Sequence, residues 1–245
     1  MNRPEIHVHV PKTAGITVRG LLIEKYGPAN VYGSDVVSGR LSSMEKQGFK
    51  ADNSQRGGRN KLAKLVTPTM AQVGLAVRDR IIGEEPAEAL KKASAVTGHF
   101  NVDAFAGIPE ADAADYITML RNPLERMVSH YRYLKQLDHK MGKMRHWGAG
   151  HNPNRPFGEF AFDERLQNYE SQFVGTDLGR YALIGTFERI DEFCENAGLI
   201  MVGEPVRNLN EGKWHGPVDS FTDSSFVHDF EQFHAVDYSL YDQVA

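Results

Sequence analysis

Cysteine, long apolar runs and an excess of positive charge are what this chain lacks, and each absence excludes a class of protein. A single cysteine, Cys194, cannot form an internal disulfide framework, and it suits a reducing compartment. No apolar run approaches the length of a membrane span, and the N-terminus lacks the charged-then-apolar pattern of a signal peptide. The formal net charge of −4 does not indicate a nucleic-acid partner or a general polyanion-binding surface, so any basic function must be local. We therefore expect a soluble, cytoplasmic protein.

The composition is otherwise that of a globular protein. The hydrophobic share is 41% and the charged share is 24%, and 245 residues are enough to bury a sizeable core. No repeat with a period of about 20–50 residues is visible. The length allows one large α/β domain or two small ones.

The most informative local pattern is the first strand and the turn that follows it. β-Branched residues alternate from Ile6 to Val10, Pro11 cannot donate a ladder hydrogen bond, and an apolar-periodic helix then runs to about Tyr26. Such a strand, tight turn and helix expose backbone N–H groups at the positive end of a helix dipole, which binds anions. The turn predicts a phosphate- or sulfate-binding loop with one lysine charge and two threonine hydroxyls: Lys12, Thr13, Ala14, Gly15, Ile16 and Thr17. The alternative is an ordinary strand-to-helix turn with a solvated lysine.

A histidine follows another short strand. Residues 95–97 have the pattern of a strand, and Gly98 and His99 come directly after it. Open α/β sheets place catalytic groups at the carboxyl ends of their strands, and an imidazole that titrates near neutrality can accept a proton from a hydroxyl nucleophile. His99 is therefore a candidate general base. The alternative is a structural histidine.

A third strand also ends in residues suited to an anion. Residues 116–120 form its apolar run, Arg121 follows, and Asn122 and Pro123 are a favourable start for the long helix after it. Ser129 lies two turns into that helix, on the face of the cap. An arginine fork with a nearby hydroxyl fits a dianionic phosphate. Alternatively, the arginine binds sheet carbonyls and the serine belongs to an amphipathic surface.

Two strands that end in anion-binding groups suggest one ligand with two separated phosphates, and here the chain resembles a known family. HVHVPKTAGIT followed by TMLRNPLERMVSHYRYL resembles the paired nucleotide motifs of sulfotransferases that use 3′-phosphoadenosine 5′-phosphosulfate (PAPS). The resemblance is strongest to carbohydrate sulfotransferases of the heparan sulfate 2-O- and chondroitin type. It implies a single sulfotransferase domain over residues 1–245, folded as an α/β, P-loop-like three-layer sandwich with a central, mostly parallel sheet flanked by helices. Residues 34–93, where the resemblance is weakest, and 139–156 would be substrate-side insertions.

The resemblance also assigns roles to individual residues. The loop from Lys12 to Thr17 would hold the 5′-phosphosulfate of PAPS, with Lys12 stabilising the leaving phosphate. Arg121 and Ser129 would hold the 3′-phosphate. His99, in a GHF stretch similar to that of the 2-O-type enzymes, would be the base. The acceptor would be a hydroxyl of a carbohydrate or glycoconjugate, although related folds also sulfate small metabolites and peptide tyrosine. No metal is expected, because sulfuryl transfer does not need one to bridge two phosphates.

Four later segments extend the resemblance. Leu166 to Gly175 is similar to the family's substrate-side helix, and Ala182 to Glu188 is similar to its next strand, which leads to a helix over Arg189–Ala197. Asn208 to Lys213 resembles a late loop that closes over the nucleotide, with Lys213 as the expected contact. Val236 to Tyr241 is similar to the terminal helix.

Two basic segments are open to two interpretations. Residues 50–61 carry four cations against one acidic residue, which fits either a loop over an acidic substrate or a solvated surface insertion. Residues 140–155 contain six lysine, arginine or histidine residues, together with Trp147, and no acidic residue, which fits either an acceptor-binding loop or a surface excursion. His139, His146 and His151 could suggest a metal cluster, but they lack regular ligand spacing.

Two other functions remain as alternatives. A P-loop kinase requires a glycine, four residues and then Gly-Lys-Ser/Thr, whereas here Lys12 precedes Gly15 and the leading glycine is absent. A nucleotide-binding module without catalytic activity would keep the fold and lose the chemistry. The presence of both the candidate lysine and the candidate base argues against the module.

Overall fold

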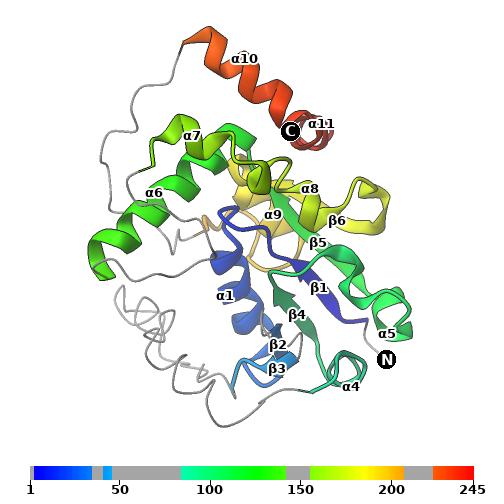
Figure 1. Ribbon diagram of the computed structural model, residues 1–245. Coiled ribbons are helices and arrows are strands. Elements are labelled where there is room, and N and C mark those ends of the chain that lie inside the picture. Colours follow the sequence, from blue (N-terminus) through cyan, green and yellow to red (C-terminus); the bar gives the residue numbers. More distant parts are fainter. Residues whose placement is uncertain (1–2, 35–40, 46–83, 142–154, 207–222) are drawn as a thin grey trace.

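The protein is described by a computed structural model, and the residues placed in it are 3–34, 41–45, 84–141, 155–206 and 223–245 (Figure 1). Its centre is a six-stranded sheet with the order β3-β2-β4-β1-β5-β6. The strands are β1 (Glu5–Val8), β2 (Val31–Ser34), β3 (Leu41–Ser43), β4 (Ala95–Gly98), β5 (Asp115–Leu120) and β6 (Tyr181–Thr186). Neighbouring strands are parallel except for the β2–β3 pair. The predicted α/β fold with a mostly parallel central sheet is confirmed.

The register of the sheet places three strand ends side by side. Val8, the last residue of β1, lies opposite Gly98 of β4 on one side and Thr118 of β5 on the other. Because the three strands are parallel, the segments that follow them leave the sheet at the same edge. The chain order also reverses around β1, and this is where open parallel sheets bind ligands.

Helices cover both faces of the sheet because successive strand side chains point to opposite sides. Ile117 and Met119 of β5 pack in one apolar cluster with α1 (Gly15–Tyr26) and α9 (Ile190–Asn196). Ile6 and Val8 of β1 belong to the cluster on the other face. That second cluster includes residues of four short helices: α4 (Pro86–Leu90), α5 (Pro109–Asp112), α8 (Ser171–Val174) and α11 (Ala235–Asp242).

A third cluster lies among the helices that extend beyond the sheet (Figure 1). It joins α6 (Pro123–Met141), α7 (Phe157–Ala161) and α10 (Ser224–Phe233), mainly through aromatic rings. Four 3-10 helices complete the described elements: η2 (Val102–Phe105), η3 (Glu164–Leu166), η4 (Leu178–Arg180) and η5 (Phe187–Arg189). Nowhere in these ranges is a helix both long and apolar enough to cross a membrane.

The predicted helix over Leu166–Gly175 is wrong for most of its length. Only Ser171–Val174 is α-helical, and Asn168 has a left-handed φ of 47°, which a continuous helix does not allow. The cause is tertiary bonding, because the N–H groups of Glu170 and Ser171 donate to the Asp237 carboxylate at 2.9 Å each. These two N–H groups therefore bind α11 rather than a preceding turn of the same helix.

The other local predictions hold where the structure describes them. α1 ends at Tyr26 and is followed by Gly27 with a φ of 77°, and the Asn122 side chain accepts the backbone N–H groups of Leu124 and Glu125 at the start of α6. Predictions for residues 50–61, for residues 142–154 and for Lys213 lie outside the described residues.

Candidate active site

The loop between β1 and α1 has the backbone form of an anion-binding turn. Lys12 and Ala14 have left-handed φ values of 75° and 64°, and Asn168 is the remaining non-glycine residue with positive φ in the described chain. Such residues are costly and cluster at functional sites, and alternating handedness turns successive N–H groups inward around an anion. Ala14 is also the N-cap of α1, and no side chain caps that helix. The first N–H groups of α1 are therefore open to a ligand.

The Thr13 hydroxyl of this loop already has a partner within the turn. It donates to the Val10 carbonyl at 2.9 Å, and this bond stabilises the turn. The Thr13 and Thr17 side chains are both buried. The loop's contribution to an anion would come from its backbone N–H groups and from Lys12.

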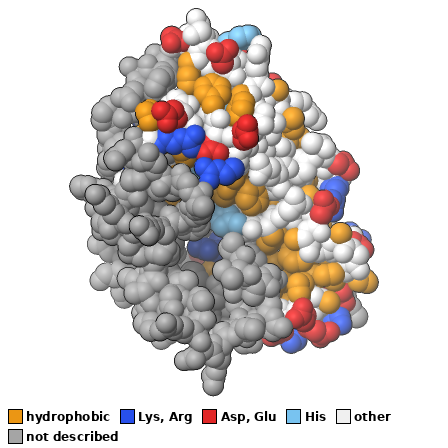
Figure 2. Space-filling model, in the orientation of Figure 1, with side chains coloured by type: hydrophobic (Ala, Val, Ile, Leu, Met, Phe, Trp, Pro, Cys, Tyr) orange, Lys and Arg blue, Asp and Glu red, His pale blue; other side chains and the backbone are white. Residues whose placement is uncertain are grey.

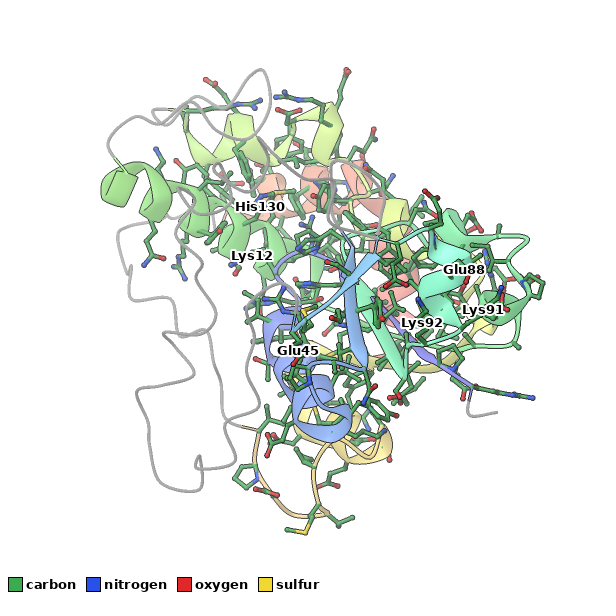
Figure 3. The ribbon with its side chains drawn as sticks, turned by 90° about the horizontal axis from the view of Figure 1, so that it is seen from below. Lys12, Glu45, Glu88, Lys91, Lys92 and His130 are labelled. Atoms are coloured by element: carbon green, nitrogen blue, oxygen red, sulfur yellow. The ribbon has the colours of Figure 1, made fainter. Side chains whose placement is uncertain are left out.

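The Lys12 ammonium lies beside α6, the helix that carries the labelled His130 in Figure 3. Its Nζ lies 4.3 Å from the centre of the Tyr133 ring. Burial, and then the positive charge of Arg121, lower the pKa of Lys12 to about 8. A lysine held near a second cation, in a half-buried position, gains from any anion that arrives between them.

Arg121 leaves β5 at the same edge of the sheet. Its Nη2 lies 3.3 Å from the Glu125 carboxylate and its guanidinium stacks over the Phe187 ring at 4.1 Å. The Arg121 Nε is buried and has no acceptor among the described residues. Glu125 is largely exposed, so its ion pair with Arg121 is weak and a dianionic ligand can replace its carboxylate.

Ser129 lies on α6 midway between the two residues that contact the cations. Glu125, Ser129 and Tyr133 are spaced four residues apart, so they form one stripe along α6. Glu125 contacts Arg121 at one end of that stripe, and Tyr133 contacts Lys12 at the other. The structure therefore brings Lys12, Arg121 and Ser129 to one surface, as the sequence predicted. On the face seen in Figure 2, histidine and Lys or Arg side chains gather in the middle, beside atoms that are not described.

His99 has the geometry of a general base. Its Nδ1 lies 2.7 Å from the carbonyl oxygen of His9, which can only accept, so Nδ1 carries the proton and Nε2 keeps a free lone pair. The side chain is exposed to solvent on one side. Burial of the rest of the ring, together with the charge of Arg19, lowers the pKa of His99, while its bond to the carbonyl opposes that shift. The imidazole is therefore neutral at pH 7 and able to take a proton.

Two further histidines lie beside His99. The His9 ring centre is 4.0 Å from that of His99, and the His7 ring stacks 5.6 Å from His9. His7 is buried, bonds the Thr97 hydroxyl at 2.9 Å, and has its pKa lowered by burial to about 3. His7 is therefore structural. The contact of His9 with His99 was not visible in the sequence, because the two residues lie 90 positions apart.

Sequence reasoning also missed a buried pair of ionisable side chains beneath Arg121. Arg126 of α6 and Glu170 are both fully buried, with Arg126 Nε 3.5 Å from Glu170 Oε1. The same Glu170 oxygen accepts the backbone N–H of Arg121 at 3.2 Å, so the pair supports the end of β5. The periodicity of apolar residues does not reveal a buried polar pair, and Glu170 meets α6 only in the folded chain.

We expect this pair to make stability depend on pH. Burial raises the pKa of Glu170 to about 8, against the attraction of Arg126. The folded protein then keeps a proton that the unfolded chain loses above pH 4.5, so the free energy of unfolding should fall as pH rises from about 4.5 to 8. Glu170→Gln, which is always neutral, should remove that decline. Urea unfolding across this range measures it, with exposed Glu159→Gln as the control. An unchanged slope in Glu170→Gln would show that the carboxylate is ionised in the folded state.

Comparison with models of known protein families and with characterised proteins gave no match. The interpretation of the site therefore rests on its residues and geometry. Among the described residues, no group of three or more His, Cys, Asp and Glu side chains is arranged to hold a metal ion. What the described chain does assemble is an uncapped helix start, two cations, a serine and an oriented neutral histidine at one sheet edge.

Proposed function

We propose that this protein is a sulfotransferase that moves the sulfuryl group of PAPS to a hydroxyl of a carbohydrate or glycoconjugate. The observation that carries the proposal is the convergence of three adjacent parallel strands. The segment after β1 offers an anion-binding turn, the segment after β5 offers a second cation, and the segment after β4 offers a base. The proposal includes the P-loop-like form of the three-layer fold, supported by the strand-loop-helix of residues 5–26 at the centre of the sheet.

The anion-binding turn would hold the 5′ end of the donor. The N–H groups at the start of α1 are preorganised dipoles, and Lys12 adds a full charge at the same place. Bound there, the donor supplies a sulfuryl group attached to a phosphate that becomes more negative as transfer proceeds. Lys12 stabilises that growing charge, and its partial burial means that water screens the attraction only weakly.

The second cation would fix the position of the nucleotide. Arg121 presents a buried Nε without an acceptor among the described residues, and Ser129 adds a hydroxyl on the same stripe of α6. Together they fit the 3′-phosphate of PAPS. This contact orients the donor without touching the reacting atoms. Lys213 is proposed as a further nucleotide contact from the sequence alone.

His99 would act on the acceptor. Its Nε2 lone pair takes the proton of the acceptor hydroxyl, and the oxygen becomes a better nucleophile toward sulfur. The proton stays on His99, and the two electrons of the broken sulfur–oxygen bond stay with the phosphate beside Lys12. A carbohydrate hydroxyl fits because it does not ionise at neutral pH without such help.

A binding assay with product nucleotide tests the proposal. We expect calorimetry to show tighter binding of 3′-phosphoadenosine 5′-phosphate than of ATP. Arg121→Ala should weaken that binding and raise the donor KM by about tenfold to a hundredfold, the cost of one charged hydrogen-bonding partner, with a small change in kcat. Arg189→Ala, which removes an exposed arginine paired with Glu192, is the matched control.

The outcomes separate the alternatives. Preference for ATP would support a kinase, and tight binding of 3′-phosphoadenosine 5′-phosphate without transfer would support a nucleotide-binding module. Mass spectrometry of acceptor mixtures from a host with the active protein and with Lys12→Ala measures transfer directly. Sulfated carbohydrate that appears only with the active protein is the expected result.

A further inference from the structure

His9 is held between the candidate base and the start of α1. Its ring centre lies 4.0 Å from that of His99, with an angle of 32° between the ring planes. The same ring also fills the space next to Gly15. A Cβ added to Gly15 would lie 1.7 Å from His9 Cδ2 and 2.0 Å from His9 Nε2, closer than any two such atoms approach.

Gly15 is therefore required by the His9 ring. Its φ is not in the left-handed region, so backbone conformation does not demand a glycine at this position. What demands it is the close approach of a side chain. The glycine of the anion-binding turn and the histidine of the strand end form one packed unit.

The backbone of His9 also makes hydrogen bonds with two consecutive residues at the end of β4, Gly98 and His99. Its N–H donates to the Gly98 carbonyl at 2.9 Å, and its own carbonyl accepts the Nδ1–H of His99 at 2.7 Å. Residue 9 thus fixes the strand end that carries His99, the tautomer of the His99 ring and the packing on one side of that ring. His9 itself is buried, and its exposed area is 6%.

We propose that His9 is a positioning residue: its carbonyl holds His99 as the Nδ1–H tautomer, its ring packs against the His99 ring, and Gly15 is present to admit the His9 ring. The inference rests on the proposed function for its catalytic meaning. Its structural content, the bonding and packing of residue 9 against the His99 ring, stands without that function.

The charges around the pair act in the same direction. Arg19 of α1 lies near all three histidines and Lys12 lies near His9, and both cations disfavour a further positive charge there. Burial, as the largest effect, and these charges keep the pKa of His9 well below its ordinary value. The His9 ring is therefore a neutral neighbour that excludes water from one side of His99.

Nuclear magnetic resonance titration of the full chain tests the proposal without any activity. In the wild type, the imidazole nitrogen shifts of His99 should report the Nδ1–H tautomer. His9→Ala keeps the carbonyl but admits water beside the ring, so the pKa of His99 should move up toward the ordinary 6.5. His9→Phe keeps a ring in that place and should hold the pKa low. An unmoved His99 titration in a folded His9→Ala protein, or the opposite tautomer in the wild type, overturns the proposal.

A second measurement uses the contact with Gly15. Gly15→Ala should displace the His9 ring, lower the unfolding temperature and raise the pKa of His99, and His9→Ala in the same chain should recover the lost unfolding temperature. If the unfolding temperature of the double variant falls by the sum of the two single decreases, the Gly15–His9 contact does not cause the instability of Gly15→Ala. If these variants shift the pKa of His99 but the wild-type protein transfers no sulfate, the positioning role stands and the proposed function is rejected.

Discussion

Lys12→Ala should lower kcat for sulfate transfer by at least about a hundredfold, because removal of one preorganised charge from a leaving group costs about that much or more. The N–H groups at the start of α1 remain in this variant, so the donor KM should rise less than kcat falls. Initial rates at saturating donor measure the effect. Lys91→Ala is the matched control, since Lys91 is an exposed lysine paired with Glu88 on α4, away from Lys12 (Figure 3).

The same lysine predicts an alkaline limit to activity. The pKa of Lys12 is lowered to about 8, so its ammonium is charged below that pH and neutral above it. The value of kcat/KM, which reports the free enzyme, should fall as pH rises through about 8. Lys12→Arg stays charged across this range, and whatever rate it retains should lose that fall. An alkaline limit that is identical in Lys12→Arg would assign the titration to another group.

The strand ends were predictable because they depend on short-range patterns. Alternation from Ile6 to Val10 and the apolar run over residues 116–120 mark strands, and Pro11 and Asn122 mark where the chain leaves them. Parallel pairing then brings the following residues to one edge without further information. The placement of Lys12, His99 and Arg121 at that edge follows from these patterns alone.

The residues that escaped prediction depend on contacts between distant segments. Glu170 reaches α6 and Asp237 reaches the turn at Asn168 only after the chain has folded, and their bonds replace the helix expected over 166–175. Thr13 bonds its own turn instead of a ligand. A charged or polar residue carries no period that would reveal its partner, so sequence patterns place backbone elements better than they place buried polar contacts.

His99→Ala should lower kcat by about a hundredfold to ten-thousandfold, the range for loss of a general base, and leave donor binding near the wild-type value. The base must be neutral, so kcat/KM of the wild type should rise through a pH below 6.5, the direction in which burial moves the pKa of His99. His99→Gln, which keeps the size and polarity, should lose the same activity. His228→Ala on α10, an exposed histidine bonded to Gln232, is the control.

Near-normal turnover in His99→Ala would sink the assignment of the base, and the structure limits what could replace it. His7 and His9 are buried, and burial keeps the pKa of each far below neutrality, so neither presents a lone pair to an acceptor in solution. Glu24 is exposed but lies near the far end of α1, more than two turns from the helix start. Of the three clustered histidines, His99 is the one that combines exposure, a fixed tautomer and a lowered pKa. Loss of kcat on its removal, with donor binding intact, is therefore the result that distinguishes a sulfotransferase from a protein that only binds the nucleotide.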